Sequence, residues 1–225
     1  MTREEAARLI DISAVRACHT ESDVRECVSV AKEYGFINVH SLPTYTALVA
    51  ELLASAPDIY VGAPVGFPGG GHRTETKLRE AELLARDGVQ EMDIVMNVGR
   101  FKDGDYHYVL DELNRVIAHV PDSITKKVII EINVLTDDEM LRAAELVIDS
   151  GADFLKTGTG WVPGGANVER IGKLKAVTGN DVKIKAAGGI RSRYEFDALL
   201  EMNVERFGIN TESAMEIVQS FEVGM

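Results

Sequence analysis

Three charged residues lie inside short apolar segments of the kind that form β-strands, where a buried charge is costly. They are Asp93, Lys156 and Lys185. Side chains alternate between the two faces of a strand, so each of the three faces away from its apolar neighbours. A neutral amine can attack a carbonyl carbon, and a second ammonium nearby lowers the pKa of the first by like-charge repulsion. The set predicts a lysine iminium that lets an adjacent carbon–carbon bond form or break, with Asp93 relaying protons.

The residues alone leave open which lysine is the nucleophile. They also leave open a plainer interpretation, in which the buried charges form a structural ion network that fills the centre of a barrel. Lys183 shares the predicted inward face with Lys185, one layer deeper or at the bottom rim, and we expect it to be structural. We expect Lys127 and Glu131 to form an inward structural pair near the chemistry.

No metal and no other cofactor is expected. The iminium chemistry needs none, and the histidines show neither an i, i+4 pair nor an HExxH motif. The five histidines are His19, His40, His72, His107 and His119.

Glycine-rich turns follow the last three predicted strands and could hold an anionic group. Glycine lets backbone N–H groups approach an anion closely, and a helix that begins at Ser192 would add its positive N-terminal end. Arg191 could add a positive charge. We therefore predict a phosphate site at these turns. Its candidate residues are Gly160, Gly188, Gly189, Gly208, Asn210 and Thr211.

Eight strand–helix pairs in 225 residues give about 28 residues per pair, the size of a βα unit with short loops. Such a series forms a parallel sheet, either closed as a (β/α)₈ TIM barrel or open and doubly wound. The glycine turns follow late strands, whereas an open sheet usually has its phosphate loop after the first strand. We therefore predict an α/β fold with a single (β/α)₈ barrel domain over residues 1–225. The expected strands are Ile10–Ser13, Phe36–His40, Ile59–Ala63, Glu91–Val95, Lys127–Ile132, Phe154–Thr157, Val182–Ala186 and Arg206–Ile209.

Start signals mark the helices between these strands. Capping boxes are predicted at Thr20, Thr136 and Ser192. Asn167 and Thr211 resemble simple N-caps. Glycines stand where helices should end, at Gly35, Gly88 and Gly151.

The composition excludes several functional classes. The chain has 24 basic and 36 acidic residues, a net charge of −12, 45% apolar residues and 27% charged residues. An acidic chain repels phosphodiester backbones, so nucleic acid is a poor partner, and charges interrupt every apolar run, so no membrane span is expected. The first residues lack the apolar stretch of a secretory signal. We expect Cys18 and Cys27 to be reduced thiols in the cytoplasm.

Five segments, in order over roughly residues 35 to 213, resemble motifs of the deoxyribose-phosphate aldolase family. The two most specific combine a strand lysine with a glycine turn: Gly151-Ala-Asp-Phe-Leu-Lys-Thr-Gly-Thr-Gly160 and Lys185-Ala-Ala-Gly-Gly-Ile-Arg191. The others are Val65-Gly-Phe-Pro-Gly-Gly-Gly, Glu91-Met-Asp-Ile-Val-Met-Asn-Val-Gly99 and Lys127-Val-Ile-Ile-Glu131.

Members of that family are (β/α)₈ barrels and metal-free class I aldolases. The resemblance implies reversible cleavage of 2-deoxy-D-ribose 5-phosphate to D-glyceraldehyde 3-phosphate and acetaldehyde. It also implies that Lys156 forms the Schiff base, that Lys185 lowers the pKa of Lys156, and that Asp93 belongs to the proton relay. The phosphate would lie at the Gly188–Gly189 turn and at the turn over 208–211. The expected partner is a small phosphorylated sugar, and family members are often homodimers.

Departures from the family's usual residues occur in the walls that would hold the sugar. Here Ile12 replaces a histidine, Gly158 a serine and Asn210 a serine, and His40 stands where cysteine is frequent. One alternative is therefore a Schiff-base aldolase for a different sugar phosphate or aldehyde. A second alternative is a non-catalytic barrel that binds a phosphorylated metabolite and uses its lysines as an anion clamp.

Overall fold

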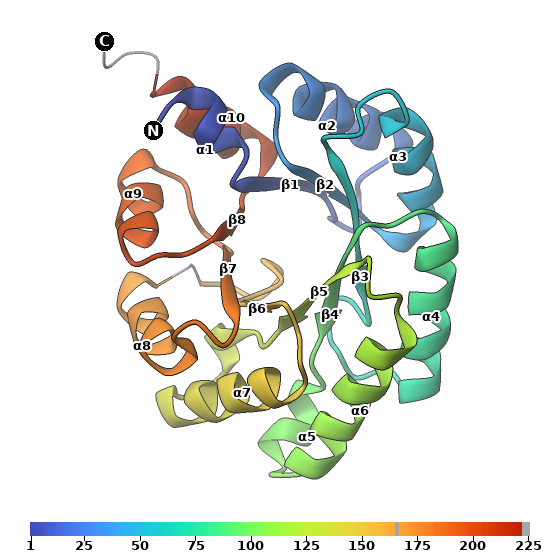
Figure 1. Ribbon diagram of the computed structural model, residues 1–225, viewed down its shortest axis with the longest axis vertical. Coiled ribbons are helices and arrows are strands. Elements are labelled where there is room, and N and C mark those ends of the chain that lie inside the picture. Colours follow the sequence, from blue (N-terminus) through green and yellow to red (C-terminus); the bar gives the residue numbers. More distant parts are fainter. Residues whose placement is uncertain (165–166, 222–225) are drawn as a thin grey trace.

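The computed structural model describes residues 1–164 and 167–221. Within them, eight parallel strands close into a barrel in chain order, so that β8 pairs with β1 (Figure 1). This is the (β/α)₈ TIM barrel that the alternating segments predict. The strands are β1 (Ile10–Ala14), β2 (Asn38–Ser41), β3 (Tyr60–Val65), β4 (Glu91–Val95), β5 (Thr125–Ile129), β6 (Phe154–Lys156), β7 (Lys183–Ala187) and β8 (Arg206–Gly208).

Helices surround the barrel on its outside (Figure 1). The first of them precedes β1 and packs against the last, so the two ends of the described chain lie side by side. The helices are α1 (Arg3–Ala7), α2 (Glu21–Tyr34), α3 (Thr46–Leu53), α4 (Thr74–Arg86), α5 (Val98–Lys102), α6 (Tyr106–His119), α7 (Asp137–Asp149), α8 (Val168–Thr178), α9 (Arg193–Glu201) and α10 (Thr211–Gln219), with 3₁₀ helices η1 (Pro43–Tyr45) and η2 (Ile132–Val134).

The predicted helix starts have local causes that the structure confirms. Capping boxes are present at Thr20, Thr136 and Ser192. In each box the cap's oxygen accepts a backbone N–H while the acidic residue three positions on accepts the cap's own N–H. Asn167 caps α8 as predicted. The prediction for α10 is wrong by one residue, because the cap is Asn210 rather than Thr211 and its side chain accepts from the N–H of Ser213.

The predicted strand ends lie within two residues of the observed ones, with one exception. β5 is predicted to run to Ile132 but ends at Ile129. The cause is Glu131, whose backbone φ of 55° turns the chain into η2. A residue with positive φ cannot continue the extended conformation of a strand.

The apolar core lies between the strands and the surrounding helices. Along β7, Ile184 and Ala186 belong to this core, and Lys185 lies on the alternate face, toward the barrel axis. The barrel interior holds charged side chains. Asp11, Asp93, Lys127 and Lys185 are each 2% exposed or less. The strand period therefore separates an apolar outer layer from a charged centre.

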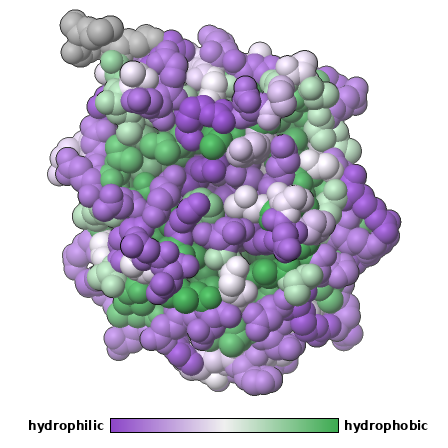
Figure 2. Space-filling model, viewed as in Figure 1, coloured by the Kyte–Doolittle hydropathy of each residue, from purple (hydrophilic) through white to green (hydrophobic). Residues whose placement is uncertain are grey.

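Hydrophilic residues cover much of the rim and reach the centre of the face viewed in Figure 2, with apolar residues visible between them. The charged residues are therefore of two kinds, exposed ones around the rim and buried ones inside the barrel. None of the described helices combines the length and the apolar character needed to cross a bilayer.

Candidate active site

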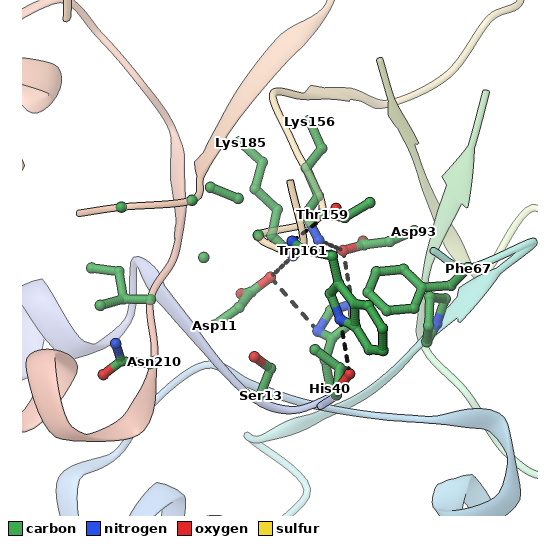
Figure 3. A pocket seen from close by; sticks show the side chains of 18 of the residues that line it. Asp11, Ser13, His40, Phe67, Asp93, Lys156, Thr159, Trp161, Lys185 and Asn210 are labelled. Atoms are coloured by element: carbon green, nitrogen blue, oxygen red, sulfur yellow. Dashed lines mark hydrogen bonds and ion pairs between the residues drawn. The ribbon is translucent and has the colours of Figure 1, made fainter. Parts of the chain in front are cut away.

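A cavity of about 310 Å³ opens where the barrel strands end, and the predicted chemical residues line it. Asp93 on β4, Lys156 on β6 and Lys185 on β7 come together there (Figure 3). The turns after β6, β7 and β8 contribute its rim. The cavity is therefore at the carboxyl end of the barrel, which is where barrel enzymes have their active sites.

Asp93 connects the two lysines. Its Oδ2 atom lies 2.7 Å from Nζ of Lys156 and 2.9 Å from Nζ of Lys185. The same oxygen lies 3.1 Å from Nε2 of His40. The side chain of Lys156 is 11% exposed and that of Lys185 is 2% exposed. Of the two amines, that of Lys156 is therefore the more accessible from the cavity.

Asp11 on β1 is a second carboxylate at this centre, and the predicted set does not include it. Its Oδ2 lies 2.5 Å from Nζ of Lys185, and its Oδ1 accepts from Nη1 of Arg206 at 2.7 Å. A sequence signal was available, because Asp11 stands between two isoleucines in a strand segment. Asp11 holds Lys185 on the side away from Asp93.

Glu91 is the third carboxylate of the cluster, two residues before Asp93 on the same face of β4. It accepts hydrogen bonds from Lys127 and from Arg206, and also from Nδ2 of Asn38 at 2.8 Å. Lys127 lies 3.5 Å from Oδ1 of Asp93 as well. Hydrogen bonds and ion pairs of Glu91 and Lys127 therefore connect the layer below the two lysines to the layer that contains them.

The charges of this cluster balance without Lys156. Apart from Lys156 it contains three carboxylates and three cations, namely Asp11, Glu91, Asp93, Lys127, Lys185 and Arg206. A fourth cation would leave an uncompensated positive charge inside the barrel, which is unfavourable. Lys156 is that fourth cation, so charge balance favours its neutral amine.

The two lysines titrate in opposite directions. Burial lowers the pKa of Lys156 to about 8, with Asp93 opposing the shift and Lys185 adding to it. Lys185 therefore lowers the pKa of Lys156, as expected of a second ammonium, but burial lowers it more. Burial also acts to lower the pKa of Lys185, but Asp11 and Asp93 outweigh it and raise that pKa. At neutral pH, Lys156 is therefore the better nucleophile.

The partners of Lys156 have defined charges. Burial acts to raise the pKa of Asp93, but the protonated forms of His40 and Lys156, together with Lys185 and Lys127, reverse this effect and hold the pKa well below its ordinary value. Asp93 is therefore ionised at neutral pH. Burial lowers the pKa of His40 to about 4, with Asp93 opposing the shift. His40 is therefore a neutral imidazole next to a carboxylate.

Two hydrogen bonds cross the mouth of the cavity, from the β1–α2 loop to the β6–α8 loop. Nη1 of Arg16 donates to the carbonyl of Gly160 at 3.0 Å, and Nε1 of Trp161 donates to the carbonyl of Val15 at 3.1 Å. The indole also meets the ring of Phe67 edge-on, with the ring centroids 5.7 Å apart (Figure 3). Arg16 and Trp161 are loop residues, and no periodicity in the sequence predicts that they line the cavity.

Five of the six predicted phosphate-site residues line the cavity, namely Gly160, Gly188, Gly189, Gly208 and Asn210. The hydroxyl of the sixth, Thr211, faces Sγ of Cys27 at 3.9 Å instead. Gly188 and Gly189 have φ values of 93° and 80°, a region that glycine adopts readily and other residues do not. The glycine turn therefore depends on glycine for its conformation.

The start of α9 is less open to an anion than the sequence predicts. The carboxylate of Glu195 accepts the N–H of Arg191 at 2.8 Å and the N–H of Ser192 at 3.0 Å. The chain's own acidic residue thus occupies these donors. At this turn, the groups that line the cavity are Gly188, Gly189 and Arg191.

Glu131 lies beside the turn after β6 and not in the charged cluster. Its carboxylate accepts from the N–H of Thr159 at 3.2 Å and from the hydroxyl of the same residue. The predicted pair between Lys127 and Glu131 is therefore wrong, because Lys127 pairs with Glu91. A Cβ on Gly158 would lie 2.7 Å from Oε1 of Glu131, so glycine makes room for this carboxylate.

Lys183 lies at the first position of β7, where it is exposed and its amine stands 5.4 Å from the ring centroid of Phe154. It is not one of the residues that line the cavity. Within residues 1–164 and 167–221, no group of three or more His, Cys, Asp or Glu side chains is arranged to hold a metal ion.

Comparison of the sequence with known proteins gives matches over almost the whole chain. A family profile described as a DeoC/LacD family aldolase matches residues 5–211, a range that includes every strand. A deoxyribose-phosphate aldolase from Rhizobium meliloti (strain 1021) is 46% identical over 215 residues, which are 96% of this chain and 86% of that protein.

Solved aldolase structures have the same fold. An aldolase designated QR15 superposes with a TM-score of 0.90 and 33% identity, covering 97% of this chain and 96% of its own. The deoxyribose phosphate aldolase from Aeropyrum pernix superposes with a TM-score of 0.86 and 26% identity, covering 98% of this chain and 92% of its own. The structure of that archaeal protein is described as tetrameric.

Proposed function

Since this chain belongs to the DeoC/LacD family of aldolases, we propose that it cleaves 2-deoxy-D-ribose 5-phosphate reversibly to D-glyceraldehyde 3-phosphate and acetaldehyde. Its family makes it a class I aldolase, a lyase that works through a lysine Schiff base. We assign the Schiff base to Lys156. The observation that carries this assignment is its accessible amine, which lies 2.7 Å from Asp93 in a cluster whose charges balance without it.

The reaction begins when the neutral amine of Lys156 attacks the aldehyde carbon C1 of the open-chain sugar. Loss of water gives an iminium, which accepts the electron pair of the C2–C3 bond as that bond breaks. The C3 hydroxyl gives up its proton, glyceraldehyde 3-phosphate departs, and the remaining enamine takes a proton at C2. Water then hydrolyses the acetaldehyde iminium and returns the amine.

Asp93 and Lys185 serve the proton transfers in this scheme. Oδ2 of Asp93 touches the amines of both Lys156 and Lys185, so protons can pass among these groups and water. Asp93 stays ionised and faces the iminium, whose permanent charge it stabilises. The phosphate that enters with the substrate supplies further negative charge when the amine becomes a cation.

The substrate phosphate is assigned to the part of the rim that the turns after β6, β7 and β8 form. Glycine turns supply backbone N–H groups there, and Arg16 and Arg191 supply positive charge. The residues of this proposed phosphate site are Gly160, Gly188, Gly189, Gly208, Asn210, Arg16 and Arg191.

The test is covalent trapping. Incubation with 2-deoxyribose 5-phosphate and borohydride should reduce the iminium and leave an added two-carbon fragment on Lys156, which peptide mass spectrometry locates. Lys156→Met should give no adduct and no cleavage, while Lys183→Met, an exposed lysine outside the cavity, should give both. An adduct on another lysine, or cleavage by Lys156→Met, would refute the assignment.

A second candidate is a Schiff-base aldolase for another sugar phosphate or aldehyde. The observation that favours it is the contact of Glu131 with Thr159 beside Gly158, because this carboxylate lies next to a wall of the cavity. A panel of sugar phosphates distinguishes the two candidates. Slow turnover of 2-deoxyribose 5-phosphate together with fast turnover of another member would favour the second.

The non-catalytic alternative makes a different prediction for the same variant. An anion clamp would bind phosphorylated metabolites without turnover, and Lys156→Met would weaken binding only. Cleavage by the wild-type protein that disappears in Lys156→Met removes this alternative.

A homodimer and a cytoplasmic location stay predictions from the sequence. The tetramer described for the Aeropyrum pernix protein makes assembly a natural property to measure. Sedimentation equilibrium gives the number of chains directly.

A further inference from the structure

His40 occupies a defined place beside the proposed Schiff-base lysine. It lies on β2, paired in register with Ser13 of β1 and with Gly62 of β3, and it is 4% exposed. Its Nε2 lies 3.1 Å from Oδ2 of Asp93, the oxygen that also touches the amines of Lys156 and Lys185. Figure 3 shows the ring below this oxygen, on the far side from the lysine stems.

A glycine on the neighbouring strand makes room for this ring. A Cβ at position 62 would lie 2.4 Å from Cε1 and 2.5 Å from Nδ1 of His40, both closer than real contacts allow. Gly62 does not have a positive φ, so its backbone conformation does not require glycine. The same Cβ would lie 2.6 Å from Oδ1 of Asn38, so the missing side chain at position 62 makes room for both the imidazole of His40 and the amide of Asn38.

The 3.1 Å contact between Nε2 of His40 and Oδ2 of Asp93 has a definite direction. Asp93 is ionised, so the proton between the two groups belongs to Nε2 of the ring. Nδ1 then carries the lone pair and lies 4.0 Å from Oδ2 of Asp11. His40 is thus a neutral donor to the carboxylate that Lys156 uses.

We propose that His40 is a positioning residue whose Nε2–H holds Oδ2 of Asp93 between the two lysine amines. This inference rests on the proposed function, because it matters for catalysis only if Lys156 forms the Schiff base. An N–H dipole at 3.1 Å from Oδ2 offsets part of the charge on that oxygen, so the carboxylate stabilises the Lys156 ammonium less. His40 thereby keeps more of Lys156 in the neutral form.

Other charged groups also face this site and set the background for any pH measurement. The groups around His40 and Lys156 are Asp11 of β1, Glu91 and Asp93 of β4, Lys127 of β5, Lys185 of β7 and Arg206 of β8. Substitution of His40 leaves all of these residues in the chain, so a change in the titration of Lys156 reports on the His40–Asp93 contact.

Two variants distinguish the effect of the Nε2–H donor of His40 from the effect of the space that its ring fills. His40→Phe keeps a planar ring and removes the donor, whereas His40→Gln can place an amide N–H near the position of Nε2. The titration of Lys156, followed by ¹³C NMR of its labelled Cε, does not depend on turnover. We expect the midpoint to rise by roughly one pH unit in His40→Phe and to stay near the wild-type value in His40→Gln.

Kinetics give a second readout from the same proteins. We expect kcat to fall about tenfold in His40→Phe, with KM nearly unchanged, and to recover most of its value in His40→Gln. Equal midpoints in all three proteins, or equal shifts in both variants, overturn the proposal. Absence of a trapped adduct in the wild-type protein overturns the proposed function instead. The NMR titration would still show whether His40 affects the pKa of Lys156.

The unmodified protein provides a test that does not depend on how the variants fold. ¹⁵N NMR of the ring should show the Nε2-protonated tautomer of His40 at neutral pH. The Nδ1-protonated tautomer or an imidazolium would overturn the proposal. Gly62→Ala, whose Cβ would meet both the ring of His40 and the amide of Asn38, should shift the midpoint of Lys156 in the same direction as His40→Phe, and a wild-type midpoint in that variant would also count against the proposal.

Discussion

Lys156 destabilises the fold in which it lies. Burial lowers its pKa to about 8, while a lysine in an unfolded chain has a pKa of about 10.4. Between these two values the unfolded chain binds more protons than the folded chain, so stability rises with pH in that range. Below about pH 8 the folded protein bears the full cost of the buried ammonium.

Lys156→Met removes this cost together with the activity. We expect the free energy of unfolding at neutral pH to rise by about 1–3 kcal/mol, and the gain to shrink between about pH 8 and pH 10. Urea unfolding of both proteins at neutral pH and near the upper end of this range measures it. Lys183→Met, which changes an exposed lysine, is the control and should show no such gain. Destabilisation of Lys156→Met at neutral pH would contradict the argument.

The central residues could be predicted because a charge inside an apolar strand segment stands out. Asp93, Lys156 and Lys185 each give that signal. Asp11 gives it too, between two isoleucines, but its strand is the least distinct in the sequence. The role of Arg16 could not be predicted, because it depends on a hydrogen bond to a loop 144 residues away in the chain.

At the level of elements, the β1–α2 and β6–α8 loops are joined across the cavity by two hydrogen bonds. Trp161 provides one of them and also contacts Phe67, so three loops meet at its side chain. These contacts lie at the mouth of the cavity, among residues that are not part of the charged cluster. They should therefore affect binding more than the chemical step.

Trp161→Phe keeps an aromatic ring and removes the donor to the carbonyl of Val15. We expect KM for the sugar phosphate to rise about two- to tenfold, as one hydrogen bond is lost, with kcat little changed. Steady-state kinetics measure both constants, and Tyr194→Phe, an exposed change on α9, is the control. An unchanged KM, or a loss confined to kcat, would show that the bridge does not serve binding.

The positions of strands and helices could be predicted where residues nearby in the sequence determine them. Short β-branched runs located the strands, and capping boxes located the starts of α2, α7 and α9. The end of β5 was not predictable, because the positive φ of Glu131 accompanies its contact with Thr159, which is distant in sequence. The choice between Asn210 and Thr211 was also open, since both residue types are good N-caps.

The whole molecule has a net charge of −12, whereas the charges of its buried cluster balance. Acid changes that balance by protonating a few buried groups. Burial lowers the pKa of His40 to about 4, below its unfolded value of about 6.5. The pKa values of Asp11 and Asp93 are also lowered, in their case by neighbouring cations that outweigh burial. In all three cases the unfolded state binds more protons, so acid destabilises the fold.

We expect stability to fall with acid in two stages. The contribution linked to His40 is lost between about pH 6.5 and pH 4, and the contribution of the two carboxylates is lost below about pH 4. Urea midpoints at a series of pH values measure this profile, and His40→Phe should lack the first stage. Fluorescence of Trp161, the single tryptophan, and far-UV circular dichroism should give coincident transitions if residues 1–225 form one domain. A midpoint that does not change between about pH 7 and pH 4 would contradict the profile.

The space beside Gly62 also bears on the ancestry of the barrel. A side chain at position 62 would force the imidazole at position 40 to move, so a lineage acquires the histidine in its present place more readily after the glycine. The opposite order passes through a protein in which the two groups collide. Reconstructed ancestors with a larger residue at 62 should therefore lack histidine at 40, and mutant libraries that vary position 40 need to keep glycine at 62.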